Sequence, residues 1–269
     1  MKWTRFCCVV AGFTATLSAL ASPAAAQGLL YYLPEDGQQV EYEGILTEAT
    51  SATDENPLKW NRELIIRSVG REDAEFNGEV QPCRWIEIKL VTGQAGAEGI
   101  VPGPVGSRVY KLLVPESRIM PEPEDDDTIP NDMIPIVRGY RRLGEESVQE
   151  LNVRAVRIYP TICLLTHYDG AEVVASNEDA DVLKQNLRVS AKHMKGKHVM
   201  ERPESRSTND GEYWVTQEVP FGIARWVVTV TRETKESTAA RDAFKVVSIL
   251  KVDMKLRDIS EAESELQTP

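Results

Sequence analysis

The histidines at positions 167, 193 and 198 are the side chains of this chain best suited to acid–base or metal chemistry at neutral pH. His193 and His198 are five residues apart, so a single strand would place them on opposite faces unless a turn at Lys195-Gly196-Lys197 folds them together. Two imidazoles without a nearby cysteine or carboxylate ligand make a poor zinc site, and the neighbouring lysines repel cations. The pattern therefore predicts a solvated turn and no metal site.

Two further groups of residues could carry chemistry. His167 stands next to Asp169 in His167-Tyr168-Asp169-Gly170, but a catalytic role needs a nucleophile brought from elsewhere, and the sequence has no G-x-S-x-G elbow. An Asp-Gly pair after a strand is typical of a hairpin turn. The acidic residues 122–127 have enough oxygen for calcium but lack the spacing of a calcium loop. We therefore expect a protein that is not an enzyme, with no catalytic residue and no cofactor. A hydrolase is the third of our functional hypotheses, after a ligand-binding protein and an interaction protein.

A basic island in an otherwise acidic chain comprises Arg138, Tyr140, Arg141 and Arg142. Guanidinium groups bind phosphate or carboxylate oxygens in a bidentate manner, so the island could hold an anionic ligand on which the tyrosine stacks. Alternatively, the arginines pair with nearby acids such as Glu145 and Glu146, because exposed ion pairs are common. The sequence leaves both alternatives open.

Residues 1–26 have the features of a secretory signal peptide. A basic start precedes an apolar run over residues 6–20, and Ala24-Ala25-Ala26 supplies an A-x-A cleavage site before Gln27. The run is shorter than the roughly 20 apolar residues of a membrane-spanning helix. We therefore expect an exported protein, in the periplasm or outside the cell, without an integral membrane segment in the mature chain.

Four cysteines divide into two pairs. Cys7 and Cys8 lie at the start of the apolar run of the signal peptide and not after it, so they are not placed to carry a lipoprotein lipid. Cys83 and Cys163 remain in the mature chain, and disulfides persist in oxidising compartments. A bridge between them would close a loop of about 80 residues and contribute roughly 4 kcal/mol. The alternative is two separate buried thiols.

The formal net charge of the chain is −11, and removal of Lys2 and Arg5 with the signal peptide makes the mature protein −13. Such a charge disfavours nucleic acid and anionic lipid surfaces as partners. About 240 mature residues suffice for a sizeable core. We expect a signal peptide at 1–26, one antiparallel β-rich domain at 27–259, and a disordered acidic tail at 260–269.

Alternation of apolar and polar residues with period two dominates the mature chain. Residues 244–256 alternate most clearly, and in residues 223–233 Trp226 is in phase with Ala224, Val228 and Val230. Further strands are expected at residues 39–46, 60–69, 84–91, 107–114, 151–158, 162–166 and 214–219. The fold class is therefore mainly β: a curved antiparallel sheet, as a half-barrel or sandwich, with one or two short helices.

Other segments are expected to be helical or irregular. Residues 178–187 favour a short helix, because Ser176 could cap it and Leu183 and Leu187 lie one turn apart. Residues 92–106 are rich in glycine and proline and predict a mobile surface loop. The proline-rich and acidic residues 115–135 predict a linker or a lid.

The motif W-x-x-x-x-V-P-x-G, formed by Trp214, Val219, Pro220 and Gly222, resembles a segment of bacterial exported proteins of unknown function. Those proteins are similar to the lipoprotein-carrier-like (LolA-like) half-barrel group, in which a curved sheet surrounds a helix-covered apolar cavity. The resemblance covers the last third of the mature chain. It implies a soluble exported β-protein that holds a lipid chain or another apolar molecule. Our first hypothesis is a non-enzymatic periplasmic protein that binds a lipid-like or other apolar ligand in the concavity of its sheet. The candidate wall or rim residues are Trp214, Val219, Phe221 and Trp226. The alternative function is an envelope protein–protein interaction or structural module with a solid core.

Overall fold

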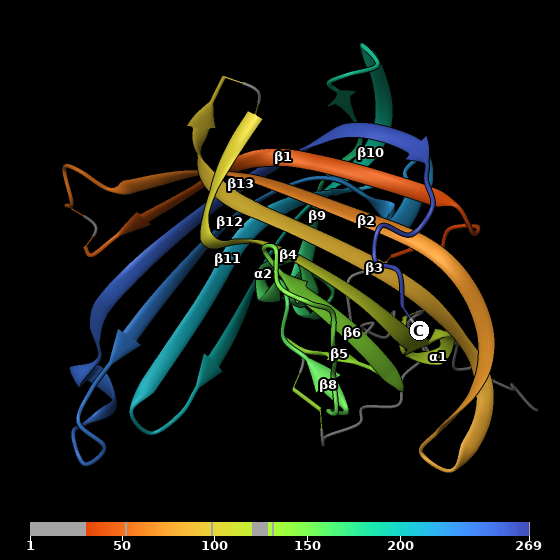
Figure 1. Cartoon of the computed structure of the whole chain (residues 1–269). Helices are drawn as coiled ribbons and strands as arrows, with labels where there is room; N and C mark the ends of the chain where they lie inside the picture. The colour runs from red at the N-terminus through yellow and green to blue at the C-terminus, as the bar shows by residue number, and fades with distance from the viewer. Residues whose placement is uncertain (1–30, 52, 98, 120–128, 131, 269) are drawn as a thin grey trace, which may run out of the picture.

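A computed structural model describes residues 31–51, 53–97, 99–119, 129–130 and 132–268. An open, strongly curved antiparallel sheet of eleven strands makes up most of it (Figure 1). The prediction of a mainly β, curved antiparallel fold is thereby confirmed. The predicted signal peptide and the acidic residues 122–127 lie outside the described residues.

The strands pair in an order that follows the chain except at the centre and near one edge. In that order they are β7 (Gln149–Glu150), β6 (Arg138–Leu143), β4 (Gly99–Pro115), β3 (Glu79–Gly96), β2 (Leu58–Phe76), β1 (Gln38–Ala49), β13 (Lys245–Glu261), β12 (Ile223–Thr234), β11 (Ser205–Val215), β10 (Leu187–Glu201) and β9 (Asp169–Val182). The remaining elements are a separate pair of strands, β5 (Ile134–Pro135) and β8 (Ala155–Val156), and the short helical segments α1 (Glu116–Ile119), α2 (Pro160–Cys163), η1 (Leu164–His167), η2 (Pro220–Gly222) and η3 (Arg241–Ala243).

Apolar side chains of alternate residues line the concave face of the sheet. Leu256 of β13 lies opposite Tyr42 of β1, which in turn lies opposite Leu64 of β2 and is followed by Leu90 of β3. Trp226 of β12 is fully buried in the same core. The predicted phase of this strand is confirmed, because period-two alternation places every second side chain on one face.

The chain's own middle segment fills the concavity. Residues of α2 and η1, among them Ile162 and Leu164, are buried in the same core cluster as the sheet's inner face. In Figure 1, α2 lies within the curve of the sheet. The strands predicted at residues 151–158 and 162–166 are wrong: only β8 forms in the first, and α2 and η1 occupy the second. A short apolar run is equally compatible with a strand and a buried helix, and only its packing distinguishes them.

The helix predicted over residues 178–187 is also wrong. These residues are the end of β9, a turn, and the start of β10. The turn folds back onto β13, where Leu183 N–H donates to the carbonyl of Leu256 at 3.3 Å and Lys184 N–H to that of Arg257 at 2.8 Å. A partner strand remote in sequence therefore overrides the local helical spacing.

Residues 92–96 and 99–106 form strand where a loop was predicted. They end β3 and begin β4, with Gly93 opposite Pro102 and Gly96 opposite Gly99. The glycine at position 93 is required by close packing, because an added Cβ would lie 2.0 Å from the Val101 carbonyl oxygen. Of residues 115–135, the described part contains the end of β4, α1 and β5.

The C-terminal residues contradict the expected disordered tail. Ser260 and Glu261 belong to β13, and Ala262 N–H donates to the Gly37 carbonyl at 2.8 Å. Residues 262–268 then lie on the outer face of the sheet, opposite the concave one, and Leu266 is fully buried there.

Candidate functional site

All four predicted wall or rim residues, Trp214, Val219, Phe221 and Trp226, are buried and belong to the core cluster. The ring of Trp226 meets that of Tyr42 edge-on at 4.8 Å between centroids and that of Tyr159, just before α2, at 6.3 Å. Tyr42 Oη donates to the Ile223 carbonyl at 2.7 Å, and burial raises the pKa of this phenol far above its ordinary value. This arrangement makes a packed aromatic core.

The turn that follows the V-P motif has left-handed backbone at two positions. Phe221 has φ of 67° and Gly222 has φ of 85°. A Cβ on Gly222 would lie 2.5 Å from the ring of Tyr32, and the carbonyl of Phe221 accepts from Tyr31 N–H at 3.1 Å. The motif therefore contacts Tyr31 and Tyr32, the first described residues, which the sequence pattern alone did not indicate.

The fourth predicted wall residue, Trp214, lies on the other face of the sheet from Trp226. Its register partners are His193 of β10 and Arg225 of β12, whereas Trp226 faces Tyr213. The imidazole of His193 stacks on the indole of Trp214 at 4.2 Å between centroids, and the Arg225 guanidinium lies 4.7 Å from the same ring. Trp214 and Trp226 therefore lie on opposite faces of the sheet, because their separation of twelve residues spans a turn that shifts the phase.

The histidines do not gather at a turn as predicted, because Lys195-Gly196-Lys197 continues β10. His193 lies between two carboxylates, with Nδ1 2.8 Å from Glu178 and Nε2 3.3 Å from Glu212. On the opposite face, His198 lies 6.5 Å from the ring of His167. Among the described residues, no group of three or more histidine, cysteine, aspartate or glutamate side chains is placed to hold a metal ion.

Each arginine of the basic island has a partner, and the partners of Arg138 and Arg142 are remote in sequence. Arg138 pairs with Glu72 and lies 5.4 Å from the ring of Trp85, on which Tyr140 stacks at 6.2 Å. Arg141 donates to Gln149 at 3.1 Å, and Arg142 pairs with Glu265 of the C-terminal segment at 2.8 Å. Arg138 and Arg142 therefore form ion pairs, with acids other than the predicted Glu145 and Glu146, whereas the partner of Arg141 is an amide.

A polar site that the sequence did not indicate lies on the outer face, where four side chains form one row across neighbouring strands. Arg67 of β2, Glu87 of β3, Lys111 of β4 and Tyr140 of β6 are register partners in turn. Glu87 is completely buried, and within the described part of the chain its carboxylate accepts hydrogen bonds only from Arg67 and from the C-terminal segment.

Three consecutive residues of the C-terminal segment bind Glu87. Its Oε1 accepts from the backbone N–H of Glu265 at 3.0 Å, and its Oε2 accepts from Leu266 N–H at 2.9 Å and from Ser264 Oγ at 2.8 Å. Each of these bonds is charge-assisted, and such bonds are about twice as strong as neutral ones.

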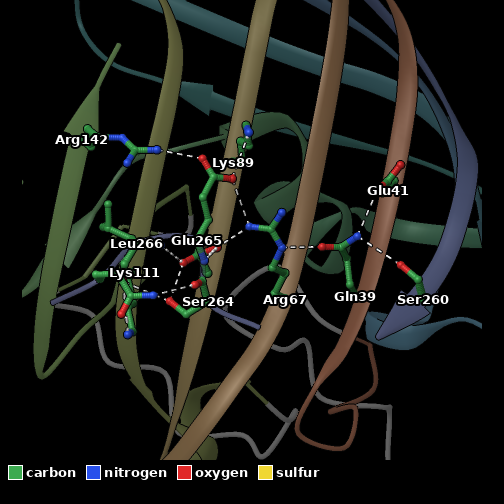
Figure 2. Close-up of polar contacts among 12 residues, drawn as sticks. Gln39, Glu41, Arg67, Lys89, Lys111, Arg142, Ser260, Ser264, Glu265 and Leu266 are labelled. Atoms are coloured by element: carbon green, nitrogen blue, oxygen red, sulfur yellow. Dashed lines mark hydrogen bonds and ion pairs between the residues drawn. The ribbon is translucent and has the colours of Figure 1, made fainter. Parts of the chain in front are cut away.

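The side chain of Glu265 is held by cations from three strands. Lys89 Nζ lies 2.9 Å away, Arg142 2.8 Å and Arg67 3.4 Å (Figure 2). Burial by itself raises the pKa of this carboxyl, but the hydrogen bond from Lys89 and the charges of these three cations outweigh it and lower the pKa. Glu265 is therefore ionised at neutral pH.

Cys83 and Cys163 are free thiols, and both are buried. Cys83 lies in β3 and Cys163 in α2, so the alternative of two separate thiols is the one seen. Burial raises the pKa of Cys163 to about 12 and also raises that of Cys83. Neither thiol is activated as a nucleophile.

The fold defines an open antiparallel sheet protein with a filled concave face and a C-terminal segment docked on its outer face. None of its described helices is long and apolar enough to cross a membrane.

Comparisons with known proteins do not assign the chain to a family. No protein-family model matches the chain, and no curated protein matches it. A solved structure that it matches is described as "Structure of DynF from the Dynemicin Biosynthesis Pathway of Micromonospora chersina", with 10% identity over 93% of this chain and 92% of that chain and a TM-score of 0.21. No family follows from these comparisons, and the LolA-like grouping stays a prediction.

Proposed function

We propose that the protein is a non-enzymatic, exported protein of the cell envelope that acts by binding a protein partner through its outer surfaces. The observation that carries this proposal is the filled concave face. Tyr159 packs on Trp226, and Tyr168 packs on Tyr213 at 5.8 Å between centroids, in the place where a carrier would hold its ligand. A small apolar ligand would have to displace the segment that contains α2 and η1.

The edge of the sheet supports a protein partner. Strand β9 ends the sheet on one side, and two of its apolar side chains, Val173 and Val174, are 49% and 54% exposed. Edge strands present unpaired backbone groups that an extended segment of another protein can bind. The carboxylates of β9, such as Glu172 and Asp179, favour a basic segment over a second copy of the same acidic edge.

Binding of a lipid-like ligand is the second candidate function. It is favoured by the aromatic and apolar character of the inner wall, where Tyr42, Trp226 and Met254 lie side by side across three strands. If the middle segment moved away, this wall would offer an apolar surface of the kind that binds acyl chains.

Native mass spectrometry of the protein purified from its own envelope separates the two candidates. We expect the mass of the processed chain without lipid, and no displacement of a fluorescent fatty acid by the purified protein. Co-purified lipid, released on denaturation, would refute the interaction proposal and favour the carrier. As a positive control for the interaction, a photo-crosslinking residue at Val174 should capture a defined partner in the envelope, whereas the same residue at buried Val228 should not.

Export is part of the same proposal and has its own test. N-terminal sequencing of protein recovered from the envelope should begin at Gln27, because the small residues Ala24 and Ala26 fit the exit of a signal peptide. A mature chain that begins far from Gln27, or that carries an acyl chain on Cys7 or Cys8, would contradict it.

A further inference from the structure

The C-terminal segment leaves the sheet at Ala262 and crosses its outer face without becoming a strand. In its described residues 263–268, the bonds to the sheet run to side chains of β2, β3, β4 and β6 and form no strand ladder. Such a segment can leave without breaking any pairing of the sheet. It is therefore arranged like a bound peptide that happens to be covalently attached.

The surface below the segment recognises three features of it. Glu87 accepts hydrogen bonds from the backbone N–H groups of Glu265 and Leu266 and from the hydroxyl of Ser264. It therefore recognises both the course of the backbone and a serine side chain. Lys89 and Arg142 donate hydrogen bonds to the carboxylate of Glu265. The side chain that follows, Leu266, is completely buried as an apolar anchor.

The charges of this surface suit an acidic ligand. Arg67, Lys89, Lys111 and Arg142 surround the single buried carboxylate Glu87, in a chain whose net charge is −11. Figure 2 shows their side chains converging on Glu265 and the residues beside it. Without the C-terminal segment, this cluster would be left with more cations than acids and with unfilled hydrogen-bonding groups, which is costly for buried polar groups.

We propose that this face is a peptide-recognition site for an acidic segment of the form serine–glutamate–aliphatic residue, and that the chain's own Ser264-Glu265-Leu266 fills it until a partner protein's segment of the same chemistry replaces it. The proposal rests on the proposed function as an interaction protein and names a second surface for it. Because a tethered segment has an effective concentration of the order of millimolar, the site is closed in the free protein. A partner must compete with the tether, which makes binding selective for closely matched segments.

The test uses the full-length chain with its own segment weakened. In the double variant Glu265→Ala/Leu266→Ala, a fluorescein-labelled peptide of residues 262–269 should bind, as measured by anisotropy, at least tenfold more tightly than it binds the wild-type chain. The same peptide carrying the two alanines should bind at least tenfold more weakly. Addition of Lys89→Ala to the double variant should weaken binding of the unaltered peptide, and so should a rise in ionic strength from about 0.05 to 0.5 M, because the charges are only partly buried.

A second experiment tests the proposal if the double variant does not fold. A chain with a site-specific protease sequence inserted after Ala262 folds with its own segment in place and is cut afterwards. The cut chain should exchange that segment for the labelled peptide. An unrelated folded protein that carries residues 262–269 at its C-terminus should bind the same site, whereas its matched double-alanine fusion should not.

Three results would overturn the inference. These are no binding by the folded double variant at about 1 mM peptide, equal binding of the two peptides, and no exchange by the cut chain. A concentration-dependent dimer held by exchanged C-terminal segments would show that the occupant is a second copy, which also overturns the assignment to a different partner. Each of these outcomes leaves the lipid measurement untouched, so failure of this inference is distinguishable from failure of the proposed function.

Discussion

Replacement of Trp226 by alanine tests the packing on which the fold and the proposed function both depend. The side chain is fully buried, and truncation of a buried aromatic residue in a rigid core costs about 3–5 kcal/mol. Its edge-on contact with Tyr42 and its contact with Tyr159 each add of the order of 0.5–1.5 kcal/mol to simple burial. Together these contributions predict a loss of about 4–8 kcal/mol in the free energy of unfolding, measured by guanidinium denaturation followed by circular dichroism.

Two variants serve as controls for this measurement. Trp226→Phe should recover most of the loss, because it keeps an aromatic ring in the core, and Val174→Ala on the exposed edge should change stability by less than about 0.5 kcal/mol. A change below about 0.5 kcal/mol for Trp226→Ala would refute the strand phase and the filled core. A stability loss below about 1.5 kcal/mol together with abolished fatty-acid binding would show that Trp226 lines a ligand cavity instead.

Three further measurements probe the backbone, the docked segment and the thiols. Gly222→Ala should destabilise the protein by at least about 1 kcal/mol more than Gly37→Ala, because both glycines have positive φ but only at Gly222 would the added Cβ come within 2.5 Å of a neighbouring side chain; equal losses would exclude crowding. The pKa of Glu265 is lowered in the folded chain, so its contribution to stability is complete above the unfolded value of about 4.3 and is lost as the pH falls through the folded pKa. Glu265→Gln should therefore flatten the acid side of the stability–pH curve, and an unchanged curve would contradict the ion pairing. Since burial raises the pKa of Cys163 to about 12 and also raises that of Cys83, a thiol reagent at pH 8 should modify both slowly until the chain unfolds, and non-reducing peptide mapping should recover them unlinked.

The candidate sites illustrate how far residue types alone could lead. The basic island was visible in the sequence, and so was the choice between an anion site and ion pairs. Its partners were not, because Glu72 and Glu265 lie 66 and 123 residues away from the arginines that they contact. Glu87 carried no signal at all, since an isolated glutamate in a strand is normally solvated.

The sequence by itself determined the fold class and the faces of the long strands. Alternation with period two places Trp226, Val228 and Val230 on one side of β12 whatever the rest of the chain does, because the pleat leaves no other choice. That information is local, so it could be obtained without knowledge of the strand's neighbours.

Only the tertiary structure decided which segments pair and which fill space. Residues 162–166 are apolar enough for a strand, but they became α2 and η1 because the curved sheet offered a concave face to cover. Residues 178–187 have helical spacing, yet residues 178–182 pair with β10, and the turn that follows them contacts β13. The acidic C-terminus looked too polar to be ordered, and it is held by cations from strands far away in the sequence. In each case the deciding interaction is non-local, and its free energy exceeds the small local preferences from which a sequence pattern is interpreted.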